Sequence, residues 1–182
     1  MGEAEAKPFL EAGDAHLRAG EYAAAERAFR DAVAAAFDSP LAHSKLGVAL
    51  AQQGQLDQAI TEFSRAVALH PGYAPAYSNL GNAYREKGMT AEAVAAYERA
   101  VALDPDYWIA HQNLGALYKQ MGRVGEAVEH FKKATRLSMR QPTGTGDAGA
   151  GTRRRLGCLP GLIAAAMALA LLAGILRAVP LL

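Results

Sequence analysis

Apolar residues recur at intervals of three and four along most of this chain and alternate with polar residues. Leu80 and Tyr84 belong to one such run, and Ala93, Val94 and Tyr97 begin the next. This spacing places the apolar side chains on one face of an α-helix. The pattern therefore predicts a succession of amphipathic helices.

The succession is a regular repeat. An offset of 34 residues aligns four blocks without insertions: residues 6–39, 40–73, 74–107 and 108–141. Every block has alanine at its twentieth and twenty-seventh places, Phe or Tyr at its twenty-fourth, and glycine at its eighth and fifteenth. The glycines are Gly13, Gly20, Gly47, Gly54, Gly81, Gly88, Gly115 and Gly122. A period of this length indicates a helical array with two helices in each block.

The repeated residues suit that arrangement. Glycine at place fifteen can end the first helix, because it adopts positive φ at low cost. Glycine at place eight and alanine at place twenty lack bulk, so the two helices can approach closely beside the aromatic ring at place twenty-four. Pro71 and Pro105 are expected to end the second helix of their blocks.

These residues resemble the tetratricopeptide repeat (TPR) family, whose motif has Leu-Gly at places seven and eight. The matching pairs are Leu46-Gly47, Leu80-Gly81 and Leu114-Gly115. The resemblance covers residues 6–141 and implies an all-α, right-handed α-solenoid of four helix-turn-helix repeats. The family's frequent Trp at place four is replaced by Phe9, His43, Tyr77 and His111, Ala12 stands for Leu in block one, and blocks one and four lack the terminal proline. Thr135 and Arg136 replace a Val-Ala pair, which predicts a polar outer face on the last helix.

The resemblance also implies a scaffold that holds a peptide or a helix in a concave groove lined by the first helix of each repeat. Side-chain amides both donate and accept, so Asn79 and Asn113, one repeat apart, are candidates to pair with an extended ligand. Solvated helix-face residues are the alternative interpretation. The candidate groove residues of blocks three and four are Ser78, Asn79, Asn82, Arg85, Gln112, Asn113 and Lys119.

Two other kinds of ligand are alternatives for the same groove. An apolar or amphipathic helix would meet Leu41, Val48 and Ile109. A carboxylate clamp for a chaperone tail needs lysine at place five, and no block has it: the residues there are Leu10, Ser44, Ser78 and Gln112. The clamp mechanism is therefore disfavoured.

A second kind of segment comes after the repeats. No residue is charged from Leu156 to Leu176, and a helix over this segment would span roughly 31 Å, which matches a hydrocarbon core of about 30 Å. We expect a transmembrane helix over residues 156–176 that acts as a tail anchor. Residues 1–5 are then a leader, residues 142–155 a flexible linker with a basic cluster, and residues 177–182 a short tail.

Charges beside this segment predict its orientation. Arg153, Arg154 and Arg155 precede it and Arg177 comes after it, so the positive-inside rule places residues 1–155 in the cytoplasm. The alanine-rich composition favours a bacterial inner membrane. Ala166, Ala170 and Gly174 form a small-residue stripe suited to close helix pairing, and the abundance of alanine in this chain explains the stripe equally well. A self-assembling membrane scaffold is therefore kept as the alternative function.

Charge and cysteine content narrow the remaining classes. A net charge of +1 disfavours general nucleic-acid binding, and one cysteine excludes an intramolecular disulfide framework. No His or Cys cluster has metal-ligand spacing, and His43 and His111 fit as core residues of their repeats. The sequence predicts no cofactor, no metal and no catalytic residue, and an enzyme with an unrecognised site is the least favoured interpretation.

Overall fold

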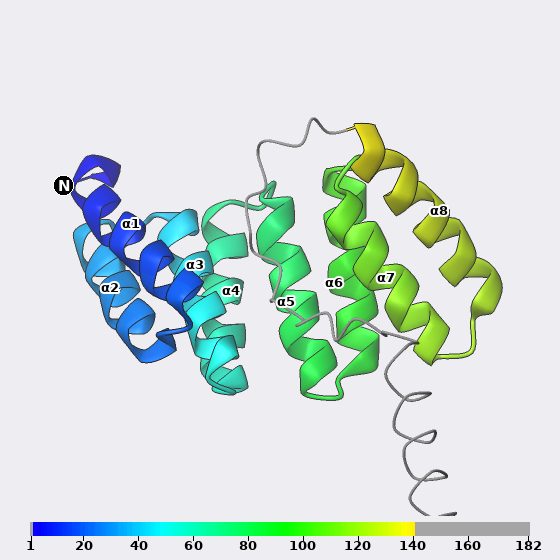
Figure 1. The fold of residues 1–182 in the computed structure, drawn as a ribbon, viewed down its shortest axis with the longest axis horizontal. Helices are drawn as coiled ribbons and strands as arrows, with labels where there is room; N and C mark the ends of the chain where they lie inside the picture. The colour runs from blue at the N-terminus through cyan, green and yellow to red at the C-terminus, as the bar shows by residue number, and fades with distance from the viewer. Residues whose placement is uncertain (1, 141–182) are drawn as a thin grey trace, which may run out of the picture. The chain divides into compact units, whose positions relative to one another are not determined.

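Residues 2–140 are described by the computed structural model, and within them every regular element is an α-helix. Each block supplies two consecutive helices, and Figure 1 shows the four pairs following one another. The helices are α1 (Glu3–Ala19), α2 (Tyr22–Ala35), α3 (Pro40–Gln52), α4 (Leu56–Leu69), α5 (Ala74–Glu86), α6 (Thr90–Leu103), α7 (Trp108–Gln120) and α8 (Val124–Arg140). The all-helical repeat array is confirmed.

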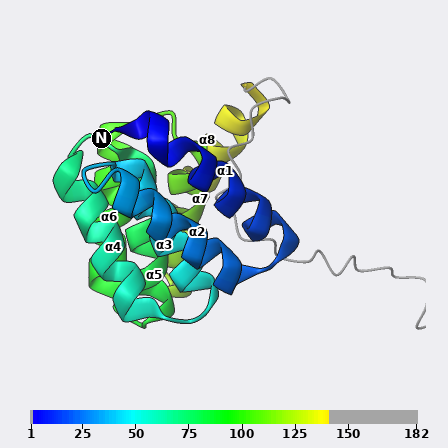
Figure 2. The same ribbon diagram turned by 90° about the vertical axis from the view of Figure 1, so that its left-hand side faces the viewer.

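The helix pairs stack in chain order. The second helix of each pair packs on its own first helix and on the first helix of the next pair. In Figure 2, which faces the α1–α2 end, the later pairs lie behind the first. The first helices α1, α3, α5 and α7 also contact one another in turn, whereas no second helix of the described chain contacts another second helix. The first helices therefore form an inner layer and the second helices an outer layer.

The turn inside each pair depends on glycine at place fifteen. Gly20, Gly54, Gly88 and Gly122 all have φ between 76° and 81°. This left-handed conformation is unfavourable for residues with a Cβ, and it lets the chain reverse within a few residues of the end of the first helix. The predicted role of these glycines is confirmed.

The close approach within each pair depends on glycine at place eight. A Cβ on Gly47 would lie 2.7 Å from the Phe63 ring, and one on Gly81 would lie 2.7 Å from the Tyr97 ring. Such distances are shorter than any ordinary carbon contact, so the aromatic side chain occupies the space that a larger residue would need. Phe63 and Tyr97 are buried and belong to the two main hydrophobic clusters.

The terminal proline of the block lies just after the second helix in only two of the four repeats. α4 and α6 end at Leu69 and Leu103, two residues before Pro71 and Pro105, as predicted. α2 ends at the equivalent residue, Ala35, although its block lacks the proline. Ser39 caps the N-terminus of α3 by accepting a hydrogen bond from the Ala42 amide. We attribute the end of α2 to this start of α3 a few residues later. α8 has neither a proline nor a subsequent helix in the described chain and continues to Arg140.

The outer face of the last pair is only partly polar. Thr135 and Arg136 are exposed, as the sequence predicts. Val124 is also 62% exposed and Val128 is 41% exposed, whereas Val94, which stands one repeat before Val128, packs against a core cluster. The difference arises because, within residues 2–140, no further helix covers α8.

No helix within residues 2–140 has the length and apolar character needed to cross a membrane. The predicted transmembrane helix at 156–176, its flanking residues Arg153, Arg154, Arg155 and Arg177, and the linker before it lie outside the described residues.

Candidate partner-binding face

The inner layer of helices carries the candidate residues. We call the side of α5 and α7 that carries the residues at places 5, 6, 9 and 12 the inner face of repeats 3 and 4. Asn79, Asn82 and Arg85 on α5 and Asn113 on α7 are half-buried, whereas Gln112 and Lys119 are exposed. The helical repeat therefore brings all of these predicted residues to one layer of the array.

Hydrogen bonds between repeats hold the two predicted amides. Asn113 donates from Nδ2 to Ser78 Oγ at 3.4 Å, and Asn79 donates in the same way to Ser44 Oγ at 3.4 Å. Ser78 is only 1% exposed, so it acts on this face by positioning Asn113 and not by contacting a ligand. Within residues 2–140, the side-chain oxygens of Asn79 and Asn113 accept no hydrogen bond.

Asn82 is held through its side-chain oxygen, whereas Asn79 and Asn113 are held through their side-chain nitrogens. The Tyr97 hydroxyl donates to Asn82 Oδ1 at 2.6 Å, which leaves the amide hydrogens of Asn82 available to an acceptor. Burial raises the pKa of Tyr97 to about 12, so the hydroxyl keeps its proton at any physiological pH. Along α5 and α7 the three side chains thus offer amide oxygens at Asn79 and Asn113 and an amide N–H group at Asn82.

The first two repeats have a different inner layer. Lys45, at the place of Asn79 and Asn113, forms an ion pair with Asp14 of α1 at 2.8 Å. The neighbouring residues Leu10, Leu17 and Val48 are apolar and pack on the core. Side-chain amides at these places therefore occur in repeats 3 and 4 and not in repeats 1 and 2.

The candidate residues for an apolar partner are about as accessible as the predicted polar residues. Val48 packs against the core cluster, and Ile109 is half-buried. Leu41 is 39% exposed. These apolar residues are separated along the array, with Leu41 and Val48 on α3 and Ile109 on α7, whereas the predicted polar residues lie together on α5 and α7, which favours a polar ligand over an apolar helix.

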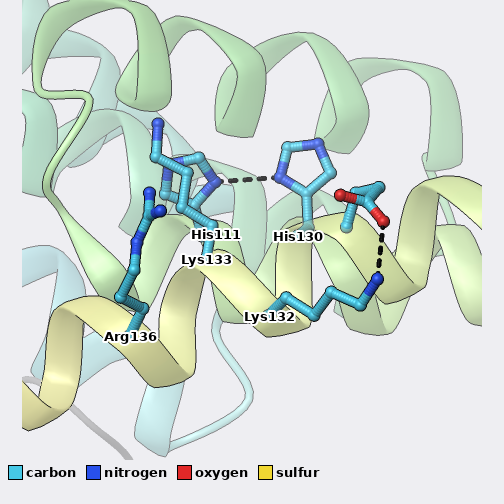
Figure 3. Close-up of a pocket in the computed structure, with 6 residues that line it drawn as sticks. His111, His130, Lys132, Lys133 and Arg136 are labelled. Atoms are coloured by element: carbon cyan, nitrogen blue, oxygen red, sulfur yellow. Dashed lines mark hydrogen bonds and ion pairs between the residues drawn. The ribbon is translucent and has the colours of Figure 1, made fainter.

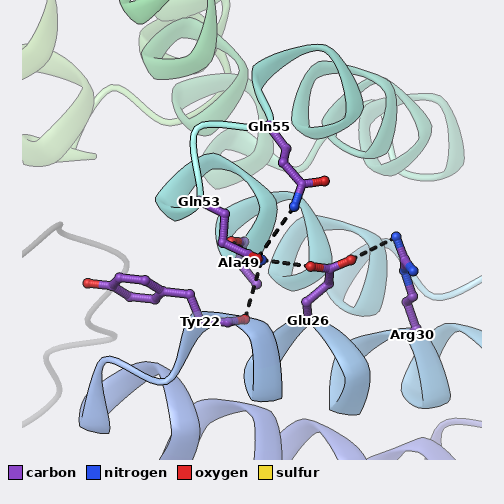
Figure 4. A network of polar contacts seen from close by, with 6 residues as sticks. All are labelled: Tyr22, Glu26, Arg30, Ala49, Gln53 and Gln55. Carbon is purple, nitrogen blue, oxygen red and sulfur yellow. Dashed lines mark hydrogen bonds and ion pairs between the residues drawn. The ribbon is translucent and has the colours of Figure 1, made fainter.

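A polar network that the sequence analysis did not identify joins repeats 1 and 2. Gln53, directly after α3, donates from Nε2 to Glu26 of α2 at 2.7 Å, and Arg30 pairs with the other oxygen of Glu26 at 2.7 Å (Figure 4). One repeat later, Lys87 pairs with Asp57 of α4. These contacts join the end of a first helix to the preceding outer helix, so they stabilise the stacking of repeats.

A second unpredicted feature is a histidine pair between α7 and α8. His111 Nδ1 lies 2.9 Å from His130 Nδ1, and His111 Nε2 lies 3.1 Å from the Pro105 carbonyl oxygen. His111 is 2% exposed, which confirms that it is a core residue of its repeat. His43 is likewise buried and contacts Glu62 at 2.7 Å. No sequence pattern other than the shared spacing of 19 residues points to these pairs.

The histidine pair forms part of a cavity of about 490 Å³ (Figure 3). Its lining residues are His111, Glu129, His130, Lys132, Lys133 and Arg136. Burial lowers the pKa of both histidines, and the positive charge of Lys133 lowers it further. Both rings are therefore held mainly neutral at physiological pH.

Comparisons with known proteins agree with the repeat geometry. Models described as tetratricopeptide repeat or TPR repeat match residues 10–74, 62–95, 81–122 and 108–140. The crystal structure of MamA is 30% identical, with 74% of this chain and 78% of that chain covered and a TM-score of 0.65. This chain belongs to the tetratricopeptide repeat family. Proteins with this fold are protein-binding scaffolds and are generally non-catalytic.

Other solved TPR structures are similar. PilF of Pseudomonas aeruginosa is 26% identical, with 76% of this chain and 64% of that chain covered and a TM-score of 0.69. The first TPR of Spaghetti (RPAP3), solved with the HSP90 peptide SRMEEVD, is 24% identical, with 67% of this chain and 97% of that chain covered and a TM-score of 0.63. The second likeness concerns the fold alone. None of the curated proteins matches this chain.

Within residues 2–140, no group of three or more His, Cys, Asp and Glu side chains is arranged to hold a metal ion. The polar groups on the inner face are amides and cations, which are suited to recognition. Side-chain amides can both donate and accept hydrogen bonds, and the cations can pair with an acidic group.

Proposed function

We propose that this TPR protein is an adaptor that binds an extended segment of a partner protein on the inner face of repeats 3 and 4. The observation that carries the proposal is the fixed amide pattern on that face. Two Asn side chains are held through their nitrogens and one through its oxygen. Because each amide is held by the protein, little side-chain entropy is lost when the other half pairs with a ligand.

The pattern matches the alternation of an extended peptide backbone. The oxygens of Asn79 and Asn113 can accept hydrogen bonds from peptide N–H groups, and the Asn82 amide can donate to a peptide carbonyl. Arg85 and Lys119 stand at the same place of successive repeats and add positive charge. These groups favour a partner segment with an acidic side chain beside its backbone contacts.

Capture of the partner tests this face. The full-length chain with a proximity-labelling tag would be expressed in its native host, beside a variant carrying Asn79→Ala and Asn113→Ala. We expect the variant to label the partner at least about tenfold less, since two hydrogen bonds of roughly 1 kcal/mol each are lost. Circular dichroism of both chains should be the same.

A matched control changes two exposed side chains of the outer layer, Gln58→Ala and Glu92→Ala. This control should label the partner as the unchanged chain does. Undiminished labelling by the Asn79 and Asn113 variant would move the partner site away from the inner face.

The second part of the proposal is that residues 156–176 anchor the adaptor in a membrane with residues 1–155 on the cytoplasmic side. The support is the uncharged length of that segment and the arginines before it. We expect the full-length chain to stay in the membrane fraction after an alkaline carbonate wash, and to be released when residues 156–182 are deleted. Release of the full-length chain by the wash would refute the anchor while leaving the binding face unaffected.

A further inference from the structure

The cavity between α7 and α8 lies apart from the inner face and is unusually basic. Three cations, Lys132, Lys133 and Arg136, line it together with the buried His111 and His130 (Figure 3). Lys132 pairs with Glu129 at 3.0 Å. Among residues 2–140, Lys133 and Arg136 form no ion pair. The cavity therefore holds more positive charge than its own carboxylate balances.

In repeat 2, the histidine at the place of His111 lies beside a carboxylate. His43 and His111 both stand at place four, and each has its Nε2 close to the carbonyl oxygen six residues earlier. The residue that faces His43 Nδ1 is Glu62, at 2.7 Å. The residue that faces His111 Nδ1 is His130, at 2.9 Å. Repeat 4 therefore replaces an internal carboxylate by a second imidazole.

The hydrogen bonds define the protons of this pair. The Pro105 carbonyl oxygen can only accept, so His111 carries its proton on Nε2 and offers a lone pair at Nδ1. His130 must then donate from Nδ1, and its Nε2 has no proton in the neutral ring. A proton taken up by His130 would give it an N–H on both nitrogens, one of them beyond the pair.

Other charges face the pair from neighbouring elements. Asp106 precedes α7, Glu98 is on α6, and Glu126 is on α8. Each favours the protonated form of a histidine, while burial and Lys133 oppose it. A bound anion beside Lys133 would offset the opposing charge and so favour protonation.

We infer that the cavity lined by His111, His130, Lys133 and Arg136 is a binding site for a tetrahedral oxyanion of the phosphate class. The anion lies beside His130, the residue that replaces the carboxylate of repeat 2, and balances the cations that line the cavity. Lys133 and Arg136 supply charge-assisted hydrogen bonds, and the histidine pair takes up a proton on binding. The site is separate from the proposed adaptor face and does not depend on it.

Sulfate is a suitable probe because it keeps one charge state over the relevant pH range. The full-length chain in nonionic detergent would be titrated with sulfate while the imidazole signals of His111 and His130 are followed by NMR. We expect a saturable shift of both rings and an affinity at least about fivefold higher at pH 6 than at pH 7.5. Absence of a saturable shift at either pH would overturn the inference.

Variants taken from the chain itself sharpen the test. His130→Glu reproduces the residue of repeat 2 and should preserve the fold while lowering the affinity at least about tenfold. Lys133→Ala should weaken sulfate binding similarly, whereas Arg65→Ala, at the equivalent place of repeat 2, should leave it unchanged. Equal sulfate affinity in the His130→Glu and unchanged chains would refute the site.

The phosphate group bound in this cavity can belong to a free anion or to a lipid headgroup. A competition experiment distinguishes these two sources. Phosphatidylglycerol would be added to the detergent micelles before the sulfate titration. A headgroup that occupies the cavity raises the sulfate concentration needed for half-saturation, which assigns the site to a lipid phosphate. An unchanged half-saturation point assigns it to a free oxyanion.

Discussion

The side-chain amide of Asn113 donates to the hydroxyl of Ser78, which lies 35 residues earlier in the chain and is buried in the preceding repeat. Asn79 and Ser44 repeat this relationship one block earlier. The amides proposed to contact a partner are thus also part of the interface between repeats. Repeat stacking and orientation of the recognition groups are consequences of the same hydrogen bonds.

This relationship predicts an energetic coupling. Ser78→Ala and Asn113→Ala, made singly and together, should show a coupling of about 0.5–1 kcal/mol in the free energy of unfolding, because each single change already removes the shared hydrogen bond. Denaturant unfolding of the four proteins measures it. Ser44→Ala combined with Asn113→Ala is the control and should be additive. Additivity in the Ser78 cycle would show that the bond does not stabilise the repeat interface.

Replacing the glycine at place eight by alanine should destabilise the fold by an amount that differs between repeats. Gly81→Ala should lower the free energy of unfolding by about 1–3 kcal/mol, because the added Cβ would lie 2.7 Å from the buried Tyr97 ring. Gly115→Ala should cost less, since its Cβ would lie 3.1 Å from the ring of the half-buried Phe131. Gly125→Ala meets nothing within 4 Å and should raise stability by up to about 1 kcal/mol. Thermal unfolding distinguishes the three, and equal losses at Gly81 and Gly115 would contradict the packing argument.

The histidine pair predicts an acid-sensitive stability. Burial and Lys133 lower the pKa of His111 and His130 in the folded chain, so below the ordinary histidine value of about 6.5 the unfolded chain binds more protons. The free energy of unfolding should be level above about pH 7 and should fall as pH decreases below about 6.5. His111→Tyr, which borrows the residue at place four of repeat 3, should reduce this fall. Denaturant unfolding at several pH values tests it, and an identical fall in the variant would assign the effect elsewhere.

Removal of the Tyr97 hydroxyl should change the inner face of repeats 3 and 4 without changing the packing of the core. The other three repeats have Phe at this place, so Tyr97→Phe should keep the packing and cost about 0.5–1.5 kcal/mol for the lost hydrogen bond to Asn82. The raised pKa of about 12 should disappear from the ultraviolet titration of tyrosinate, while that of Tyr118 remains at about 12. Persistence of both late titrations would show that Tyr97 is not the buried group.

Much of the fold could be predicted because its determinants are local and repeated. A glycine with positive φ, a glycine beside an aromatic ring and an apolar spacing of three and four act within one block, and the offset of 34 residues shows each of them four times. The exposure of Val124 and Val128 on α8 was less predictable. It depends on whether another helix packs against α8 and not on the residues of α8 themselves.

The candidate site was predicted as a set of residues but not as a set of roles. Helical register alone places Asn79, Asn82 and Asn113 on the inner layer. Register does not show that Asn79 and Asn113 donate to serines of the preceding repeat, or that Asn82 accepts from Tyr97. Ser78 stands at a predicted groove place and is nevertheless buried, because the next repeat covers it.

The sequence by itself determined the TPR array, its turns and the places that face inward, because these depend on periodicity and on the conformational limits of single residues. Only the tertiary structure decided which polar groups remain available and where unbalanced charge collects. His111 and His130 are in contact because of the way α7 and α8 pack against each other. Asn113 contacts Ser78 because repeats 3 and 4 stack with α5 and α7 side by side. Such pairings depend on side-chain packing between elements, which no local pattern in the chain records.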